Sequence, residues 1–356
     1  MKNLFTKEHT LITKGVLIIM MLIHHLFTAD LVESHQVITL LSNSRMYSYI
    51  NGYCKMCIAG FAFLTAFGMT HSLMETYDYS GNDYFKLVCK RLIKLQSTVI
   101  FVCTLAIIYK RFVMVESIRE LYDNGNGFSI IYIIIDMLGL ATYFGTPTIN
   151  VTWWYITYAV LLIVTMPFIF MAYKKFRYLL LIVGCLLSTI VLNGGACFSV
   201  LLPSVLLGTA FAYERGFDKI CALDKGGFNK FVRICVEIFG IIVSYYLYCD
   251  VELIYSYIFA FLIPLIVLEF VAYIPIIKGI LRFIGKHSKN IFLTHTFVYY
   301  YFYTEQIYSF KKDWLILLIM LIVCIGVSIL LDLLKKISGY TKLIDNIVVG
   351  IIQKSM

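Results

Sequence analysis

The sequence predicts an all-α integral membrane protein, a bundle of about ten transmembrane helices with both ends of the chain in the cytoplasm. Hydrophobic residues make up 60% of the 356 residues, charged residues make up only 14%, and the mean hydropathy is +0.84. A water-soluble chain of this length needs more charge on its surface. Apolar runs of about 18 or more residues recur from end to end, and each can cross a hydrocarbon core about 30 Å thick.

The apolar runs define the expected helices one by one. The backbone polar groups of a segment in lipid must bond within that segment, so each run is expected to be a helix. The first run carries internal polar residues and lacks a small-residue cleavage site, which predicts a retained helix rather than a signal peptide. The expected helices are 11–29, 50–73, 95–112, 152–172, 178–194, 197–213, 232–249, 252–274, 290–305 and 314–334.

The Lys and Arg residues set the expected orientation. When the N-terminus is placed in the cytoplasm, most of the 30 basic residues fall on the cytoplasmic side, as the positive-inside rule requires. This arrangement holds only if the apolar stretch 128–145, which contains Asp136 and two glycines, does not cross the membrane completely. We therefore expect 128–145 to be a re-entrant or outer-surface helix, and the whole chain, 1–356, to form one transmembrane domain.

Two features that could indicate other functions carry little weight. The net charge of +9 could indicate nucleic acid, but the basic residues lie in short clusters between apolar runs, so we expect no nucleic-acid partner. Cys54 and Cys57 form a CxxC pair, but no second CxxC and no nearby pair of histidines completes a metal site. We therefore expect no bound metal, and we expect most of the ten cysteines to be small buried hydrophobic residues.

Ionisable residues inside lipid are costly, so they mark candidate sites. The first expected helix contains Lys14, His24 and His25. Lys14 and His25 are eleven residues apart, which is three helical turns, so they share one face about 16 Å apart along the axis, and His24 is rotated by about 100°. Two interpretations stay open from the residues alone. Either the two side chains belong to a reactive site, or Lys14 extends to the cytoplasmic surface and His25 is a buried hydrogen-bonding group.

The second candidate is the basic segment 86–94 at the expected cytoplasmic start of the third helix. Arg91 and Lys94 are three residues apart, which places them on one face of a helix. Such a pair can hold the phosphates of a nucleotide-like donor. Anchoring at the cytoplasmic surface explains the same cluster equally well.

The third candidate is the segment 285–295, which leads into the ninth expected helix. We expect Gly285 to break a short interfacial helix and Ser288 or Asn290 to cap the next one. His295 then lies about one turn inside the membrane. There it could bridge two helices or bind a ligand.

Taken together, these segments resemble the membrane acyltransferase-3 family over nearly the whole chain. The family has a basic residue, ten residues and then a histidine in its first helix, as in Lys14 to His25 here. Its small-residue turn is loosely matched by 59–68, its basic RxxR-like motif by 90–94, and its aromatic start of the fourth span by 153–155. Its late GxxSxxIYLxH pattern is closely matched by 285–295, with Phe in place of Tyr at 292.

The resemblance implies an enzyme that moves an acyl group, usually acetyl from acetyl-CoA, to a hydroxyl of a cell-surface glycan. It implies that His25 acts as general base, or forms a covalent acyl-histidine, and that Lys14, Arg91 and Lys94 hold the CoA phosphates. Two departures from the family pattern stand out. Lys14 and Lys94 replace arginines, which keeps the charge but loses two-pronged phosphate geometry, and no acidic residue follows in 156–159.

Two other classes of function compete with this interpretation. A secondary transporter would also use buried ionisable residues, a re-entrant segment and a glycine break such as Gly194-Gly195. A passive, partner-binding membrane protein would tolerate replacement of Lys14 and His25. For the enzyme, we expect a multi-pass protein of the plasma membrane among its lipids, with a surface polysaccharide or lipid-linked glycan as acceptor and a homo-oligomer as one allowed assembly.

Overall fold

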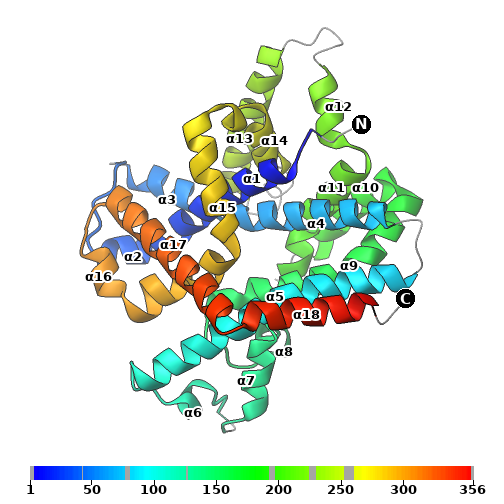
Figure 1. Ribbon diagram of the computed structural model, residues 1–356. Coiled ribbons are helices and arrows are strands. Elements are labelled where there is room, and N and C mark those ends of the chain that lie inside the picture. The colour runs from blue at the N-terminus through cyan, green and yellow to red at the C-terminus, as the bar shows by residue number, and fades with distance from the viewer. Residues whose placement is uncertain are drawn as a thin grey trace. The chain divides into compact units, whose positions relative to one another are not determined.

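The described residues of this chain fold into helices, as the sequence predicts (Figure 1). The computed structural model describes residues 4–41, 43–76, 81–125, 127–191, 197–223, 230–251 and 260–353. Within these residues the β pairing consists of two isolated bridges, Ile38 with Lys312 and Asp123 with Phe128. The chain forms two compact units.

The first unit comprises Met1–Glu75, Met166–Lys289 and Thr304–Ile322. Its helices from the first two segments are α1 (Lys7–Leu26), α2 (Ala29–Ser34), α3 (Ser44–Tyr53), η1 (Cys54–Met56), α4 (Cys57–Glu75), α10 (Tyr178–Val191), α11 (Cys197–Tyr213), α12 (Gly216–Ala222), α13 (Lys230–Val251), α14 (Leu262–Glu269) and η6 (Val271–Tyr273), and α16 (Thr304–Tyr308) comes from the third.

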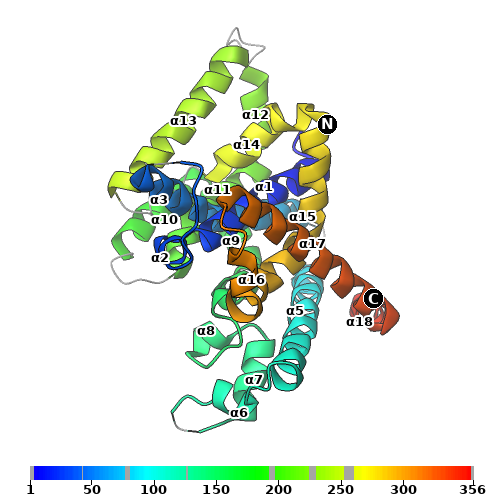
Figure 2. The same cartoon turned by 90° about the vertical axis from the view of Figure 1, so that its left-hand side faces the viewer.

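The second unit comprises Thr76–Thr165, Asn290–Tyr303 and Val323–Met356. It contains α5 (Gly81–Phe112), α6 (Ile118–Leu121), α7 (Ile130–Met137), α8 (Ala141–Phe144), η2 (Val151–Trp153), the π-helix η7 (Phe297–Phe302) and α18 (Tyr340–Gln353). Three helices run from one unit into the other: α9 (Trp154–Phe176), α15 (Pro275–Thr296) and α17 (Asp313–Ile337). Figure 2 shows the same helices from a second direction.

Five helices of the described residues are long enough and apolar enough to cross a membrane. Three shorter apolar helices accompany them, at Tyr178–Ser188, Val200–Tyr213 and Leu262–Tyr273. The chain is therefore a multi-pass membrane protein, while the larger number of about ten spans and the cytoplasmic termini remain predictions. The candidate spans are Lys7–Leu26, Arg45–Glu75, Asp83–Phe112, Val151–Phe176 and Asp313–Ile337. The Gly194-Gly195 break lies outside the described residues.

Two expected boundaries are wrong, and both lie in polar stretches of long helices. Helix α5 begins at Gly81 rather than near residue 95, so the basic segment 86–94 is part of the helix. Helix α15 is continuous from Pro275 to Thr296, so Gly285 does not break it and neither Ser288 nor Asn290 caps a new helix. Hydropathy marks where a helix is apolar, whereas these helices continue through their polar turns.

The stretch 128–145 folds as two short helices, α7 and α8. Helix α7 has 8 residues, a length of about 12 Å, which is too short to cross a bilayer. Glycines at positive φ separate and end the two helices, Gly139 at 67° and Gly145 at 63°. The expectation that this stretch does not cross completely agrees with this geometry.

Gly285 serves close packing in the first unit. A Cβ at Gly285 would overlap the backbone carbonyl of Leu11, and a Cβ at Gly15 would overlap that of Leu281. Helices α1 and α15 therefore approach each other backbone to backbone at two places. Only glycine permits this distance.

Replacing Gly285 by alanine is expected to destabilise the protein by about 1–3 kcal/mol, because the backbones of α1 and α15 must separate. Gly279→Ala is the matched control, since it lies on the same helix and a Cβ there meets no other atom within 4 Å. That control should be neutral or slightly stabilising through helix propensity. Thermal unfolding in detergent compares the two variants, and equal midpoints would contradict the close approach.

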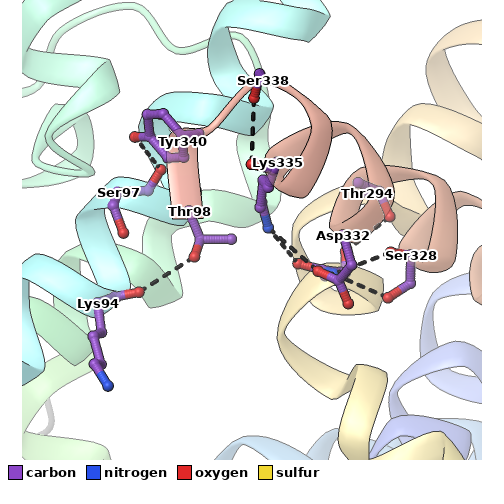
Figure 3. A network of polar contacts seen from close by, with 10 residues as sticks. Lys94, Ser97, Thr98, Thr294, Ser328, Asp332, Lys335, Ser338 and Tyr340 are labelled. Carbon is purple, nitrogen blue, oxygen red and sulfur yellow. Dashed lines mark hydrogen bonds and ion pairs between the residues drawn. The ribbon is translucent and has the colours of Figure 1, made fainter. Parts of the chain in front are cut away.

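A polar network joins α15 to α17 within the second unit (Figure 3). Asn290 Nδ2 donates to Asp332 Oδ1 at 2.9 Å and to Ser328 Oγ at 3.0 Å. The ammonium group of Lys335 donates to Asn290 Oδ1 at 3.2 Å. Asn290, expected to be a helix cap, is therefore a bridge between two helices. The amphipathic helix α18 follows, and its Tyr340 hydroxyl donates to the Ser97 carbonyl of α5 at 2.8 Å.

Candidate functional site

Helix α1 runs without a break through both Lys14 and His25, as their spacing predicts. Thr6 begins the helix as a capping box, in which its side chain and that of His9 bond reciprocally to backbone N–H groups. Both candidate side chains are partly buried. Three helical turns place them on one face, about 16 Å apart along the axis.

The C-terminal turn of α1 is held by side chains from later in the chain. Asn51 Nδ2 donates to the carbonyls of Ile23 at 2.7 Å and His24 at 3.1 Å. The Tyr308 hydroxyl donates to the Leu26 carbonyl at 2.8 Å. The last carbonyls of a helix have no partner within the helix, so these bonds fix the end of α1 on which His25 sits.

His24 takes part in the same fixation. Its Nδ1 lies 3.1 Å from the Asn51 carbonyl, and because a carbonyl can only accept, that nitrogen carries the hydrogen. The rings of His24 and His25 are 5.1 Å apart and tilted by 55°. His24 therefore joins α1 to α3, while His25 faces a different direction on the helix.

Arg91 and Lys94 lie on one face of α5, three residues apart, in the second unit. Both are exposed. The side chain of Lys94 points away from Lys335 and its network (Figure 3). The structure thus places Arg91 and Lys94 together on α5, and it places Lys14 and His25 on α1.

His295 is completely buried in α15 of the second unit. Its Nδ1 donates to the Phe292 carbonyl at 2.8 Å, and its Nε2 lies 3.3 Å from Thr296 Oγ1. The π-helix Phe297–Phe302 begins just after it. Such wide turns are frequent at functional sites.

Thr296 connects this histidine to the start of α9. Its hydroxyl lies 2.9 Å from that of Thr152, which donates to Asn150 Oδ1 at 2.8 Å. The indole of Trp153 donates to the Leu293 carbonyl at 3.2 Å. Sequence reasoning pointed to the aromatic residues here but not to Asn150, Thr152 or Thr296. The sequence signal for Asn150 and Thr152 is an asparagine two residues before a threonine at the start of a helix, whereas Thr296 has no such local signal.

Asp136 organises the polar residues that precede α9. Its carboxylate accepts hydrogen bonds from the hydroxyls of Tyr122 at 2.8 Å and Thr148 at 2.7 Å, and from the Ile149 N–H at 2.7 Å. It is 1% exposed. Burial raises the pKa of the Asp136 carboxyl, and the three donors act in the opposite direction.

Asp136→Ala is expected to cost about 1–3 kcal/mol of stability, because it leaves buried donors without an acceptor. Asp136→Asn should cost less, since the amide oxygen can still accept and the amide NH₂ can donate to Thr148 Oγ1. Because the pKa of Asp136 is raised in the folded protein, this group stabilises the fold at low pH, and the stabilisation is lost as the pH rises through that pKa. Unfolding midpoints against pH test this, and an asparagine variant with the wild-type pH slope would contradict it.

These features define a multi-pass helical membrane protein that carries ionisable side chains on several of its helices. A family model described as an acyltransferase domain matches residues 12–333, which is most of the chain. The chain belongs to the acyltransferase-3 family and is a membrane acyltransferase. No curated protein and no solved structure matches it.

Proposed function

We propose that this protein is a plasma-membrane O-acyltransferase that moves an acetyl group from acetyl-CoA to a hydroxyl of a surface polysaccharide or lipid-linked glycan. Family membership supports the reaction class, and it favours an enzyme over a transporter. The observation that carries the proposal for this chain is helix α1. It presents Lys14 and His25 on one face, three turns apart, and its end is fixed by Asn51 and Tyr308.

His25 acts as general base on the acceptor hydroxyl. An imidazole ordinarily titrates near neutral pH, which suits it to take a proton and release it again. The hydroxyl oxygen bonds to the acyl carbon, the carbon–sulfur bond breaks, and the proton from the hydroxyl ends on the CoA sulfur. In a covalent variant, the imidazole itself carries the acyl group between donor and acceptor.

Lys14, Arg91 and Lys94 supply positive charge for the phosphates of CoA. Arg91 provides two-pronged hydrogen bonding, whereas the two lysines act as point charges. The exposure of Arg91 and Lys94 on one face of α5 supports this role, because a charged ligand can reach them.

The proposal is tested by incubating membranes that contain the protein with acetyl-labelled acetyl-CoA and extracted surface glycans. Label should appear in the glycan only when protein, donor and glycan are all present. Label bound to the protein after incubation with donor alone would select the covalent variant. Movement of an unmodified substrate across the membrane without label transfer would make the protein a transporter.

Lys94→Ala is expected to raise the KM for acetyl-CoA about tenfold with little change in kcat, because the lost charge binds donor equally before and during reaction. Lys94→Arg should keep the wild-type KM. Arg111→Ala is the control, since Arg111 is an exposed cation at the opposite end of the same helix. An unchanged KM in Lys94→Ala would assign the basic segment to membrane anchoring.

A further inference from the structure

The side-chain amide of Asn150 is held in one orientation. Its Oδ1 accepts hydrogen bonds from the backbone N–H of Thr152 at 3.0 Å and from the Thr152 hydroxyl at 2.8 Å. An amide nitrogen cannot accept a bond from a backbone N–H. The oxygen must therefore face Thr152, and Nδ2 must face the other way.

Asn150 Nδ2 is a buried donor without an acceptor among the residues that the structure describes. The whole residue is 0% exposed. Buried polar groups nearly always have a hydrogen-bond partner, and an exception calls for an explanation. The explanation that fits a fixed donor is an oxygen atom that arrives with a ligand.

The surroundings of Asn150 keep this donor fixed. The Thr152 hydroxyl forms a hydrogen bond with the hydroxyl of Thr296, which follows His295 and is the N-cap of the π-helix. On the other side, the Thr148 hydroxyl lies 3.2 Å from both the N–H and the carbonyl oxygen of Asn150, and it also donates to Asp136. An N–H group that is held in place before reaction is the kind of group that stabilises a developing oxyanion.

The position in the fold suits negative charge as well. Asn150 is the N-cap of η2, which continues directly into α9. The start of a helix carries partial positive charge and favours an anion there. Asn150 also belongs to the same unit as Arg91 and Lys94, the residues proposed to bind the donor.

We propose that Asn150 Nδ2 binds the carbonyl oxygen of the acyl thioester and stabilises the negative charge that forms on it. This inference rests on the proposed acyl transfer. When the acceptor oxygen adds to the carbonyl carbon, the carbonyl electrons move to its oxygen, where Nδ2 donates. When the carbon–sulfur bond breaks, the carbonyl re-forms, and the proton taken from the acceptor reaches the CoA sulfur.

The inference is tested with Asn150→Asp and Asn150→Ser, which both keep an oxygen to cap η2 and lose the amide donor. The expected result is a fall in kcat of about 10²–10³-fold, with the Kd for acetyl-CoA changed by less than about threefold. Asn124→Ala, in an exposed loop of the same unit, should leave kcat unchanged.

The infrared band of the acetyl carbonyl gives a second readout. With carbonyl-labelled acetyl-CoA bound to the wild type, the hydrogen bond should shift this band below that of free acetyl-CoA. The shift should disappear in Asn150→Ser. If the carbonyl band of acetyl-CoA bound to the wild type stayed at the frequency of free acetyl-CoA, the partner of Nδ2 would be a buried water rather than the thioester. That result would overturn the inference.

Failure of the inference and failure of the proposed function give different results. If the wild type transfers label and Asn150→Ser transfers it equally fast, the enzyme stands and the role of Asn150 is overturned. If the wild type binds acetyl-CoA with a shifted carbonyl but labels no glycan, the donor site stands and the proposed acceptor fails.

Discussion

His25→Ala is expected to lower acyl transfer by about 10²–10⁴-fold, the range that a positioned general base contributes. The loss should fall on kcat, because the imidazole acts on the hydroxyl during bond formation rather than on donor binding. His25→Gln should be equally poor, since glutamine can form hydrogen bonds but cannot take up a proton at neutral pH. Steady-state label transfer to glycan measures all of these variants.

Two other histidines serve as comparisons for His25. His71 is partly exposed on α4 and pairs with Glu75, so His71→Ala should transfer label at the wild-type rate. His24→Ala should lower the unfolding midpoint through its bond to Asn51 while retaining the wild-type pH profile of the surviving activity. Full activity in His25→Ala would remove the general base from this helix and leave the reaction chemistry to other residues.

The helices of this chain could be predicted more reliably than their ends. Apolar runs found the cores of α1, α4, α9 and α17 because hydropathy is a property of local sequence. The same measure placed the start of α5 too late, since the segment 86–94 is polar but helical. The expected helix break at Gly285 is wrong for another reason: its close approach to Leu11, distant in the sequence, cannot be seen locally.

The residues of the candidate site also differ in whether local sequence reveals them. Lys14 and His25 could be paired from sequence because their spacing within one helix decides which face they share. The cap formed by Asn150 and Thr152 is local, but the bond from Thr152 to Thr296, 144 residues further along the chain, could not be predicted. Hydrogen bonds between distant segments leave no periodic pattern in a single sequence.

Arg233 shows how burial can reverse the interpretation of a charge. It lies near the start of the expected helix 232–249 and is one of the basic residues behind the expected orientation, but it is only 4% exposed in the first unit. Its guanidinium group donates to Glu269 Oε2 at 2.7 Å and to the Ile220 carbonyl at 3.0 Å. The other Glu269 oxygen accepts from the Cys221 thiol at 2.8 Å, and Glu237 lies 3.8 Å from Arg233 Nε.

Arg233→Met is expected to destabilise the first unit by about 3–5 kcal/mol, because it leaves the carboxylate of Glu269 buried without its cation. Lys219→Ala removes an exposed cation from Glu214, which keeps its second cation Arg177, and should cost at most about 1 kcal/mol. The double variant Arg233→Met/Glu269→Met removes both charges and should recover part of the loss, with Glu237 limiting the recovery. Unfolding midpoints in detergent give the coupling energy between the two residues. If the effects of the single variants Arg233→Met and Glu269→Met added up to the effect of the double variant, the pair would contribute no more than separate surface charges do.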